Sequence, residues 1–146
     1  MASLQGTNAL LNLSFCSDDV EYKRQVEQLV FENLARSALV HLNDYRCLCP
    51  SIIAKPPSER PYGIHADWTL QEDLEWPSLH VWCALQDVSA DNGAMAFIPG
   101  SHRLFNEIWG VESGRCYGGA EQLLASMAVS VPIEAGEAII FDNAIL

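Results

Sequence analysis

A histidine and an aspartate stand two positions apart in the segment Tyr62-Gly-Ile-His-Ala-Asp-Trp68, and together they could hold a metal ion. Side chains alternate between the two faces of an extended strand, so His65 and Asp67 would point to the same side. One imidazole and one carboxylate are two of the three ligands in the 2-His-1-carboxylate triad of non-haem Fe(II) oxygenases. The spacing therefore predicts a partial iron site, whose third ligand would have to come from elsewhere in the chain.

The composition is that of a globular protein, because 49% of the 146 residues are hydrophobic and they are spread along the chain. No apolar run approaches the roughly 20 residues of a membrane-spanning helix. The net charge of −11, from 19 acidic and 8 basic residues, argues against binding to a nucleic-acid backbone. The first residues lack a signal peptide's basic region, and the five cysteines have no disulfide spacing. We therefore expect a cytoplasmic protein with a small-molecule partner and neither a nucleic-acid nor a membrane partner.

The first third of the chain is predicted to contain one helix and two strands. Asp18, followed three positions later by Glu21, forms a capping-box pattern. Apolar residues then recur at steps of three and four, at Val26, Leu29, Val30 and Leu34. Ser37–Leu42 and Cys47–Ala54 are short apolar segments bounded by turn formers, which predicts strands. We interpret Cys47 and Cys49 as buried residues of the second strand, because no further ligands at zinc-site spacing accompany them.

The remainder is predicted as short β-strands. Residues 55–61 contain three prolines, which favours a surface loop leading into the His65 strand. Leu79–Val88 and Ala94–Ile98 flank Asn92-Gly93, a dipeptide that is typical of a tight hairpin. A short helix at Glu121–Met127 and strands at Val129–Ile133 and Ala138–Asp142 complete the pattern.

Many short strands separated by turns predict a mostly β, α+β fold of the double-stranded β-helix type, that is, a cupin-like jelly-roll with an N-terminal helix. We expect a single domain over residues 1–146. Its helical lead-in would cover about residues 1–36 and its jelly-roll core about residues 37–146. His65 and Asp67 would then lie on the inner face of the barrel wall.

Several segments, in this order and at these separations, resemble the phytanoyl-CoA dioxygenase family, a branch of the Fe(II)/2-oxoglutarate oxygenases. His65-Ala-Asp-Trp68 is similar to the metal-binding segment of that family, and Lys55-Pro-Pro57 to the loop before it. The stretch from Trp82 through Asn-Gly to Pro-Gly-Ser-His102 resembles its most recognisable region. Gly136–Leu146 resembles the strand that leads to the distal histidine. The resemblance extends over most of the chain from residue 45 onwards.

The resemblance implies a dioxygenase that uses Fe(II), 2-oxoglutarate and O2 to hydroxylate a small molecule, converting 2-oxoglutarate to succinate. His65 and Asp67 would be its catalytic and metal-binding residues. The carboxylate of Asp67 favours hydroxylation, because related halogenases carry a small residue there. Trp82 and Ser51 would line the 2-oxoglutarate pocket, although Trp82 could equally be a core residue. Strand alternation places Trp82 on one face with His80, but which face is inward is left open.

In the family, a distal histidine follows the strand that Gly136–Leu146 resembles, and a later arginine pairs with the far carboxylate of 2-oxoglutarate. Neither has an equivalent in the sequence. We therefore expect the chain to be an oxygenase fragment that lacks the last strand and has little activity by itself. Three other histidines are weaker candidates for the third ligand: His41, His80 and His102. The alternative is a non-catalytic jelly-roll binding module, or a pseudo-enzyme without metal.

Overall fold

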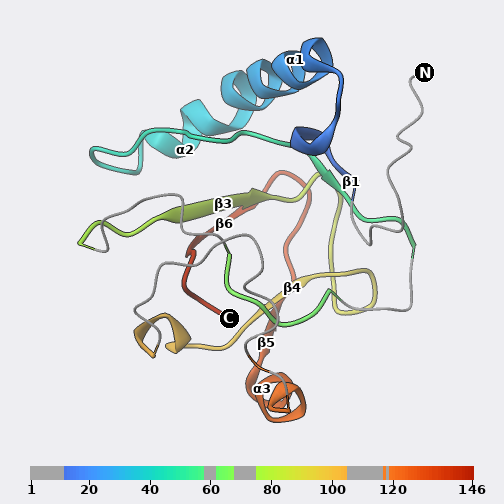
Figure 1. Cartoon of the computed structure of the whole chain (residues 1–146), viewed down its shortest axis with the longest axis vertical. Helices are drawn as coiled ribbons and strands as arrows, with labels where there is room; N and C mark the ends of the chain where they lie inside the picture. The colour runs from blue at the N-terminus through green and yellow to red at the C-terminus, as the bar shows by residue number, and fades with distance from the viewer. Residues whose placement is uncertain (1–11, 58–61, 68–74, 105–116, 118) are drawn as a thin grey trace. The chain divides into compact units, whose positions relative to one another are not determined.

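The structure, a computed structural model, describes residues 12–57, 62–67, 75–104, 117 and 119–146 (Figure 1). The chain divides into two compact units, Met1–Tyr62 and Gly63–Leu146. Residues 58–61 of the predicted proline-rich loop, and Trp68 after the predicted metal segment, lie outside the described residues. The described part combines helices with short antiparallel sheets.

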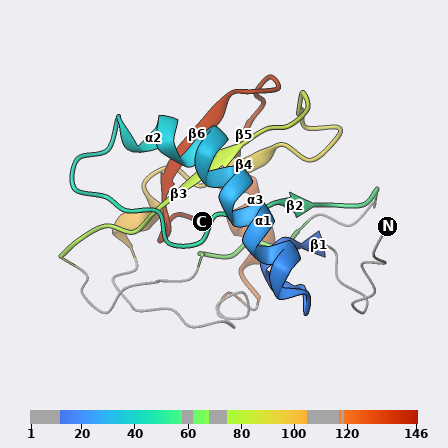
Figure 2. The same cartoon turned by 90° about the horizontal axis from the view of Figure 1, so that it is seen from above.

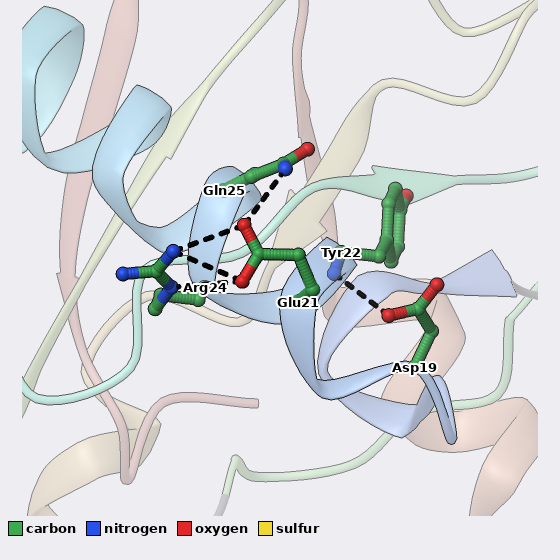
Figure 3. Close-up of polar contacts among 5 residues, drawn as sticks. All are labelled: Asp19, Glu21, Tyr22, Arg24 and Gln25. Atoms are coloured by element: carbon green, nitrogen blue, oxygen red, sulfur yellow. Dashed lines mark hydrogen bonds and ion pairs between the residues drawn. The ribbon is translucent and has the colours of Figure 1, made fainter.

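Helix α1 (Val20–Val30) of the first unit begins one residue later than the sequence predicts. The side chain of Asp19 accepts a hydrogen bond of 3.0 Å from the backbone N–H of Tyr22 (Figure 3). This bond satisfies one of the N–H groups that have no partner within the first turn of a helix. Asp19 is therefore the N-cap, and the predicted cap at Asp18 is wrong.

Glu21 does not complete a capping box, because its carboxylate binds side chains one turn further along the helix. It accepts hydrogen bonds of 3.1 and 3.0 Å from the Arg24 guanidinium and of 2.9 Å from the Gln25 amide (Figure 3). Residues three and four apart are neighbours on a helix surface, which explains the choice of partners. The hydrogen bonds from Arg24 and then Gln25 lower the pKa of Glu21.

The helical segment continues where a strand was predicted at Ser37–Leu42, so that prediction is wrong. A π-helical turn, η2 (Phe31–Ala35), and helix α2 (Arg36–Leu39) follow α1 directly. Helix α2 consists of Arg, Ser, Ala and Leu, mostly strong helix formers, and so short an apolar run has no diagnostic period. Of the predicted apolar stripe on α1, Val26 is buried, whereas Leu29 is 55% exposed.

Only the end of the strand predicted at Cys47–Ala54 forms. Strand β2 (Ile53–Ala54) pairs antiparallel with β1 (Asn12–Leu13). Two hydrogen bonds between Ser14 and Ile52, of 3.0 and 2.9 Å, extend the pairing by one position. Ser14 opens a 3-10 turn, η1, that ends at Cys16.

Cys47 and Cys49 were predicted to lie in a strand, but they precede β2 and belong to no strand. Cys47 is half-buried and Cys49 is exposed, so the interpretation of both as buried residues is also wrong. Their partial burial raises the pKa of both thiols, which favours the neutral form. The chain around them is irregular because Pro50 follows directly and removes a backbone donor.

The second unit contains two arms of chain, residues 79–97 and 129–142, that pair antiparallel with each other (Figures 1 and 2). Its strands are β3 (Leu79–Cys83), β4 (Met95–Phe97), β5 (Val129–Val131) and β6 (Ala138–Asp142). β3 pairs with β6, and β4 pairs with β5. An isolated bridge between Val88 and Ile133 links the arms between these sheets. The first arm thus runs beside the second in nested order.

The hairpin predicted between Leu79–Val88 and Ala94–Ile98 is wrong, because the strands within these segments belong to different sheets. The turn itself forms where it was predicted. Gly93 has a φ of 102°, a value that glycine adopts without strain. The Asn92 side chain accepts a hydrogen bond of 2.6 Å from the backbone N–H of Ser89. The turn therefore carries the chain from the β3–β6 sheet to the β4–β5 sheet.

Helix α3 (Glu121–Met127) forms at the predicted residues, and a 3-10 turn, η3 (Ser101–Arg103), follows β4. The core of the second unit consists of Ala66, Ile98, Tyr117 and Leu146, with Ile64, Leu124 and Ala128 packed against them. This core lies against the segment that carries the two predicted metal ligands. None of the helices in the described residues has the length and hydrophobicity needed to cross a membrane.

Candidate metal centre

The segment that carries the two predicted ligands is anchored in the core of the second unit. Ala66 is fully buried and Ile64 packs against the same core. Alternation along an extended chain therefore turns His65 and Asp67 to the opposite side. The prediction that this segment is a strand is wrong. It is nevertheless held in place, because the Asp67 N–H donates a hydrogen bond of 2.9 Å to the carbonyl of Asn143.

The carboxylate of Asp67 lies between two imidazoles. His65 Nε2 is 3.4 Å from Oδ1, and His80 Nδ1 is 2.7 Å from Oδ2. The side chains of His65, Asp67 and His80 are 33%, 30% and 40% exposed, so the cluster is half-buried and open on one side. The structure thus brings the two predicted residues together and adds a third, His80, to them.

The tautomer of His65 follows from its hydrogen bond. Its Nδ1 lies 2.8 Å from the carbonyl oxygen of Gly63, and a carbonyl can only accept, so Nδ1 carries a proton. In the neutral imidazole, the lone pair is then on Nε2, which lies 3.4 Å from Oδ1 of Asp67. A cation between these two atoms, either a second proton on His65 or a metal ion, would satisfy both of them.

Both pKa shifts agree with this arrangement. The hydrogen bond to Asp67 raises the pKa of His65, against the opposing effect of burial. Burial alone would raise the pKa of Asp67, but the hydrogen bonds and charges of His65 and His80 outweigh it. The pKa of the Asp67 carboxyl therefore lies well below its ordinary value. Asp67 is consequently anionic at neutral pH and available to bind a cation.

The His65 and Asp67 pair fits two positions of a metal site. Imidazole and carboxylate ligands that lie about 2.1 Å from one ion, at right angles, are about 3 Å apart. The observed separation of Nε2 and Oδ1 is 3.4 Å. In the part of the chain that the structure describes, no group of three or more His, Cys, Asp and Glu side chains is arranged to hold a metal. Of the expected triad, the described residues could therefore supply only the two predicted ligands, His65 and Asp67.

Strand β3 positions His80 and shows which of its faces is turned to the candidate ligands. His80 lies opposite Phe141 of β6, and their ring centroids are 5.5 Å apart. Because His80 reaches Asp67, the face that it shares with Trp82 is the one directed to the site. Trp82 is half-buried opposite Ile139. Its predicted role in a 2-oxoglutarate pocket, or in the core, stays a prediction.

Asn143, which the sequence analysis did not single out, links the segment of Asp67 to Ser78 by hydrogen bonds. It is 4% exposed. Its backbone N–H donates to the carbonyl of Ser78 at 2.9 Å, and its amide donates to the Ser78 hydroxyl at 2.8 Å. Its carbonyl accepts the Asp67 N–H. The only signal in the sequence is a polar residue just after an apolar strand, which is equally typical of an exposed turn.

The other predicted residues belong to segments other than those that carry this cluster. Ser51 is a half-buried residue just before β2 in the first unit, and His41 is exposed in the same unit. His102 lies in η3 of the second unit. Its neighbour Ser101 is buried and accepts a 2.8 Å hydrogen bond from the backbone N–H of Leu146. That bond gives the turn a structural role.

A protein-family model described as Phytanoyl-CoA dioxygenase (PhyH) matches residues 6–146. The match includes the helical segment of the first unit as well as both candidate ligands. No curated protein and no solved structure was found to match the chain.

Proposed function

This chain belongs to the phytanoyl-CoA dioxygenase family, and from that premise we propose that it is the iron-binding part of an Fe(II)/2-oxoglutarate-dependent dioxygenase, whose activity requires the full-length protein. The reaction would insert one oxygen atom of O2 into a C–H bond of a small organic molecule. The other oxygen atom would enter 2-oxoglutarate, which loses CO2 and becomes succinate. The observation that carries the proposal is the separation of His65 Nε2 and Asp67 Oδ1, which at 3.4 Å is close to that of two ligands of one metal ion.

In this proposal, His65 and Asp67 hold the iron, which when bound supplies the activation of O2. The carbonyl of Gly63 fixes the His65 tautomer, so that Nε2 is the atom presented to the metal. The anionic Asp67 offers charge compensation. Metal binding would displace the proton that the carboxylate otherwise favours on His65, so binding should release a proton.

We further infer that the strands form a jelly-roll, as the family implies. The nested pairing supports this, because the β3–β4 arm lies antiparallel to the β5–β6 arm and passes from one sheet to the other at the turn at Gly93. Antiparallel arms folded over two sheets are the plan of a jelly-roll. A crystal structure with all four strands in one flat sheet would contradict the inference.

Trp82 and Ser51 are proposed as residues of the 2-oxoglutarate pocket. For Trp82, the support is that it shares the face of β3 from which His80 reaches Asp67. Ser51 rests on the family resemblance alone. Trp82→Ala should raise KM for 2-oxoglutarate more than Ser51→Ala does. Unchanged KM in both variants would leave Trp82 as a core residue.

The proposed function is tested by succinate release from 2-oxoglutarate, measured in the intact protein with and without added Fe(II). His65→Gln should lose the Fe(II)-dependent rate, because the amide cannot replace the Nε2 lone pair. The matched control is His41→Gln, an exposed histidine of the first unit, and it should keep the parent rate. Equal rates in the parent and both variants would refute the assignment of His65.

A second candidate function is a jelly-roll binding module without a metal. The observation in its favour is that the described residues supply only two ligands of a triad. In either function, we propose a small molecule rather than nucleic acid as partner, because acidic residues outnumber basic ones by 19 to 8. Equilibrium dialysis with Fe(II) under anaerobic conditions separates the two, since the binding module should retain no iron.

A further inference from the structure

We propose that His80 is a positioning residue, which holds one oxygen of the Asp67 carboxylate so that only the other is presented to the metal. The inference rests on the proposed function and adds a residue to that site. It follows from the observation that the two oxygens of the Asp67 carboxylate contact different histidines. Oδ2 lies 2.7 Å from His80 Nδ1, whereas Oδ1 faces His65 Nε2 at 3.4 Å.

The contact with His80 involves a buried atom. Nδ1 of His80 is shielded from solvent and makes no hydrogen bond of good geometry within the described residues, but it lies 2.7 Å from Oδ2 of Asp67. A buried ring nitrogen is normally satisfied by a partner. Because an ionised carboxylate can only accept, we infer from the 2.7 Å contact that Nδ1 carries the proton. A charge-assisted contact of this kind is stronger than one between neutral groups.

Other residues hold both His80 and Asp67 in place. The His80 ring packs against Phe141, whose ring in turn packs against Phe97 with centroids 4.9 Å apart. On the other side, the backbone of Asp67 is bonded to Asn143, which is itself bonded to Ser78. The carboxylate therefore has a defined orientation, with Oδ2 beside His80 and Oδ1 beside His65.

This geometry distinguishes positioning from ligation. His80 Nδ1 contacts one oxygen of the carboxylate, Oδ2, whereas His65 Nε2 pairs with the other, Oδ1. A carboxylate held in this way binds a metal through a single oxygen, which leaves more coordination positions for a cosubstrate and O2. Partners that orient a metal ligand in this manner typically contribute 10–100-fold to metal affinity.

The test is a titration of the full chain with Co(II), followed by visible absorption, and it needs no turnover. His80→Leu should weaken Co(II) binding by about tenfold. His80→Asn should restore the parent affinity, because the amide nitrogen of asparagine occupies nearly the place of Nδ1 and donates the same bond. His41→Leu is the matched control, and Asp67→Ala tests the proposed function itself. Thermal unfolding of every variant reports whether it folds.

Three outcomes would count against the proposals. Parent-level or tighter Co(II) binding in His80→Leu, with binding lost in Asp67→Ala, would refute the role of His80 and leave the metal site intact. Equal loss in His80→Leu and His80→Asn would make His80 a ligand and refute positioning. Parent-level binding in Asp67→Ala would refute the metal site, and the proposed function with it.

A second measurement applies even where His80→Leu does not fold. In the metal-free parent chain, 15N-edited NMR of the histidine rings should show a proton on Nδ1 of His80. That signal should shift in Asp67→Ala, where the acceptor is gone. A His80 ring protonated on Nε2 alone would overturn the inference, because Nδ1 could then donate nothing to the carboxylate.

Discussion

Two carboxylates in this molecule are each bound by two neighbouring side chains, yet the clusters differ in range and in exposure. Glu21 pairs with Arg24 and Gln25 within one helix, and the ion pair is 57% and 73% exposed. Asp67 meets His65 from its own segment and His80 from β3, and these side chains are 30–40% exposed. Water can replace the partners of Glu21, but it replaces those of Asp67 less completely.

Similar polar contacts in this molecule therefore have different roles. The Glu21 cluster is local, and sequence neighbours alone make it possible. The Asp67 cluster needs β3, β6 and the segment at Asn143 to be in place, so it exists only in the folded second unit. We therefore expect changes at Asp67 to alter activity, changes around it to alter stability and changes at Glu21 to alter little.

The largest expected effect is that of Asp67→Ala on hydroxylation by the intact protein. The change removes the anionic ligand, so the rate should fall by more than about 100-fold, the upper limit for loss of a mere supporting partner. Succinate and hydroxylated product, quantified by mass spectrometry, provide the measurement. Asp91→Ala, at an exposed aspartate of the same unit, is the control and should keep the parent rate. A parent-like rate in Asp67→Ala would refute the proposal that Asp67 is a metal ligand.

The next largest effect is expected at Asn143, which holds the Asp67 segment in place. Asn143→Ala removes a buried amide and leaves the Ser78 hydroxyl without its 2.8 Å donor. Loss of such a partner typically costs about 1–3 kcal/mol. Urea unfolding should show this decrease in the free energy of unfolding. Asn33→Ala is the exposed counterpart, since the amide of Asn33 bonds to the carbonyl of Leu29 at the surface. Equal losses in both variants would remove the distinction between the two environments.

A smaller effect is expected from pH in the metal-free protein. The pKa of His65 is raised above its ordinary value of 6.5, so its stabilising contribution is complete below pH 6.5 and is lost as pH rises through the raised pKa. The pKa of Asp67 is lowered from 3.8, so its contribution is present above pH 3.8 and is lost as pH falls through the lowered pKa. The pair should therefore stabilise the fold most between these ordinary values.

The urea midpoint, measured from pH 4 to pH 9 in the parent and in His65→Gln, tests this dependence. The decrease above pH 6.5 should be shallower in the variant, because glutamine has no proton to lose. Parallel curves across the range would show that His65 has the same pKa in the folded and unfolded chain.

Features set by adjacent residues could be predicted from the sequence. The turn at Asn92-Gly93 forms because its conformation depends on those two residues, and helix α3 forms at the predicted bounds. His65 and Asp67 share a side because alternation is a local property of extended chain. The cap of α1 was missed by one residue because Asp18 and Asp19 carry the same side chain, and only the chain path selects Asp19.

Features that depend on distant contacts could not be predicted in the same way. The pairing of β3 with β6 joins segments separated by more than 50 residues, and no nearby residue specifies it. The contact of His80 with Asp67 depends on that pairing, since alternation predicts two faces but not which one packs inward. The role of Asn143 depends likewise on Ser78 being brought beside it.

The smallest effect is expected at the exposed Glu21 cluster. Glu21→Gln keeps the size of the side chain but removes its charge, and the ion pair with Arg24 is highly exposed. Solvent screening should leave the urea midpoint of the variant close to that of the parent. Asp19→Ala, two positions earlier, removes the cap and should cost about 1 kcal/mol, because the Tyr22 N–H loses its acceptor. A loss in Glu21→Gln as large as that in Asp19→Ala would show that exposure does not decide which of these carboxylates matters.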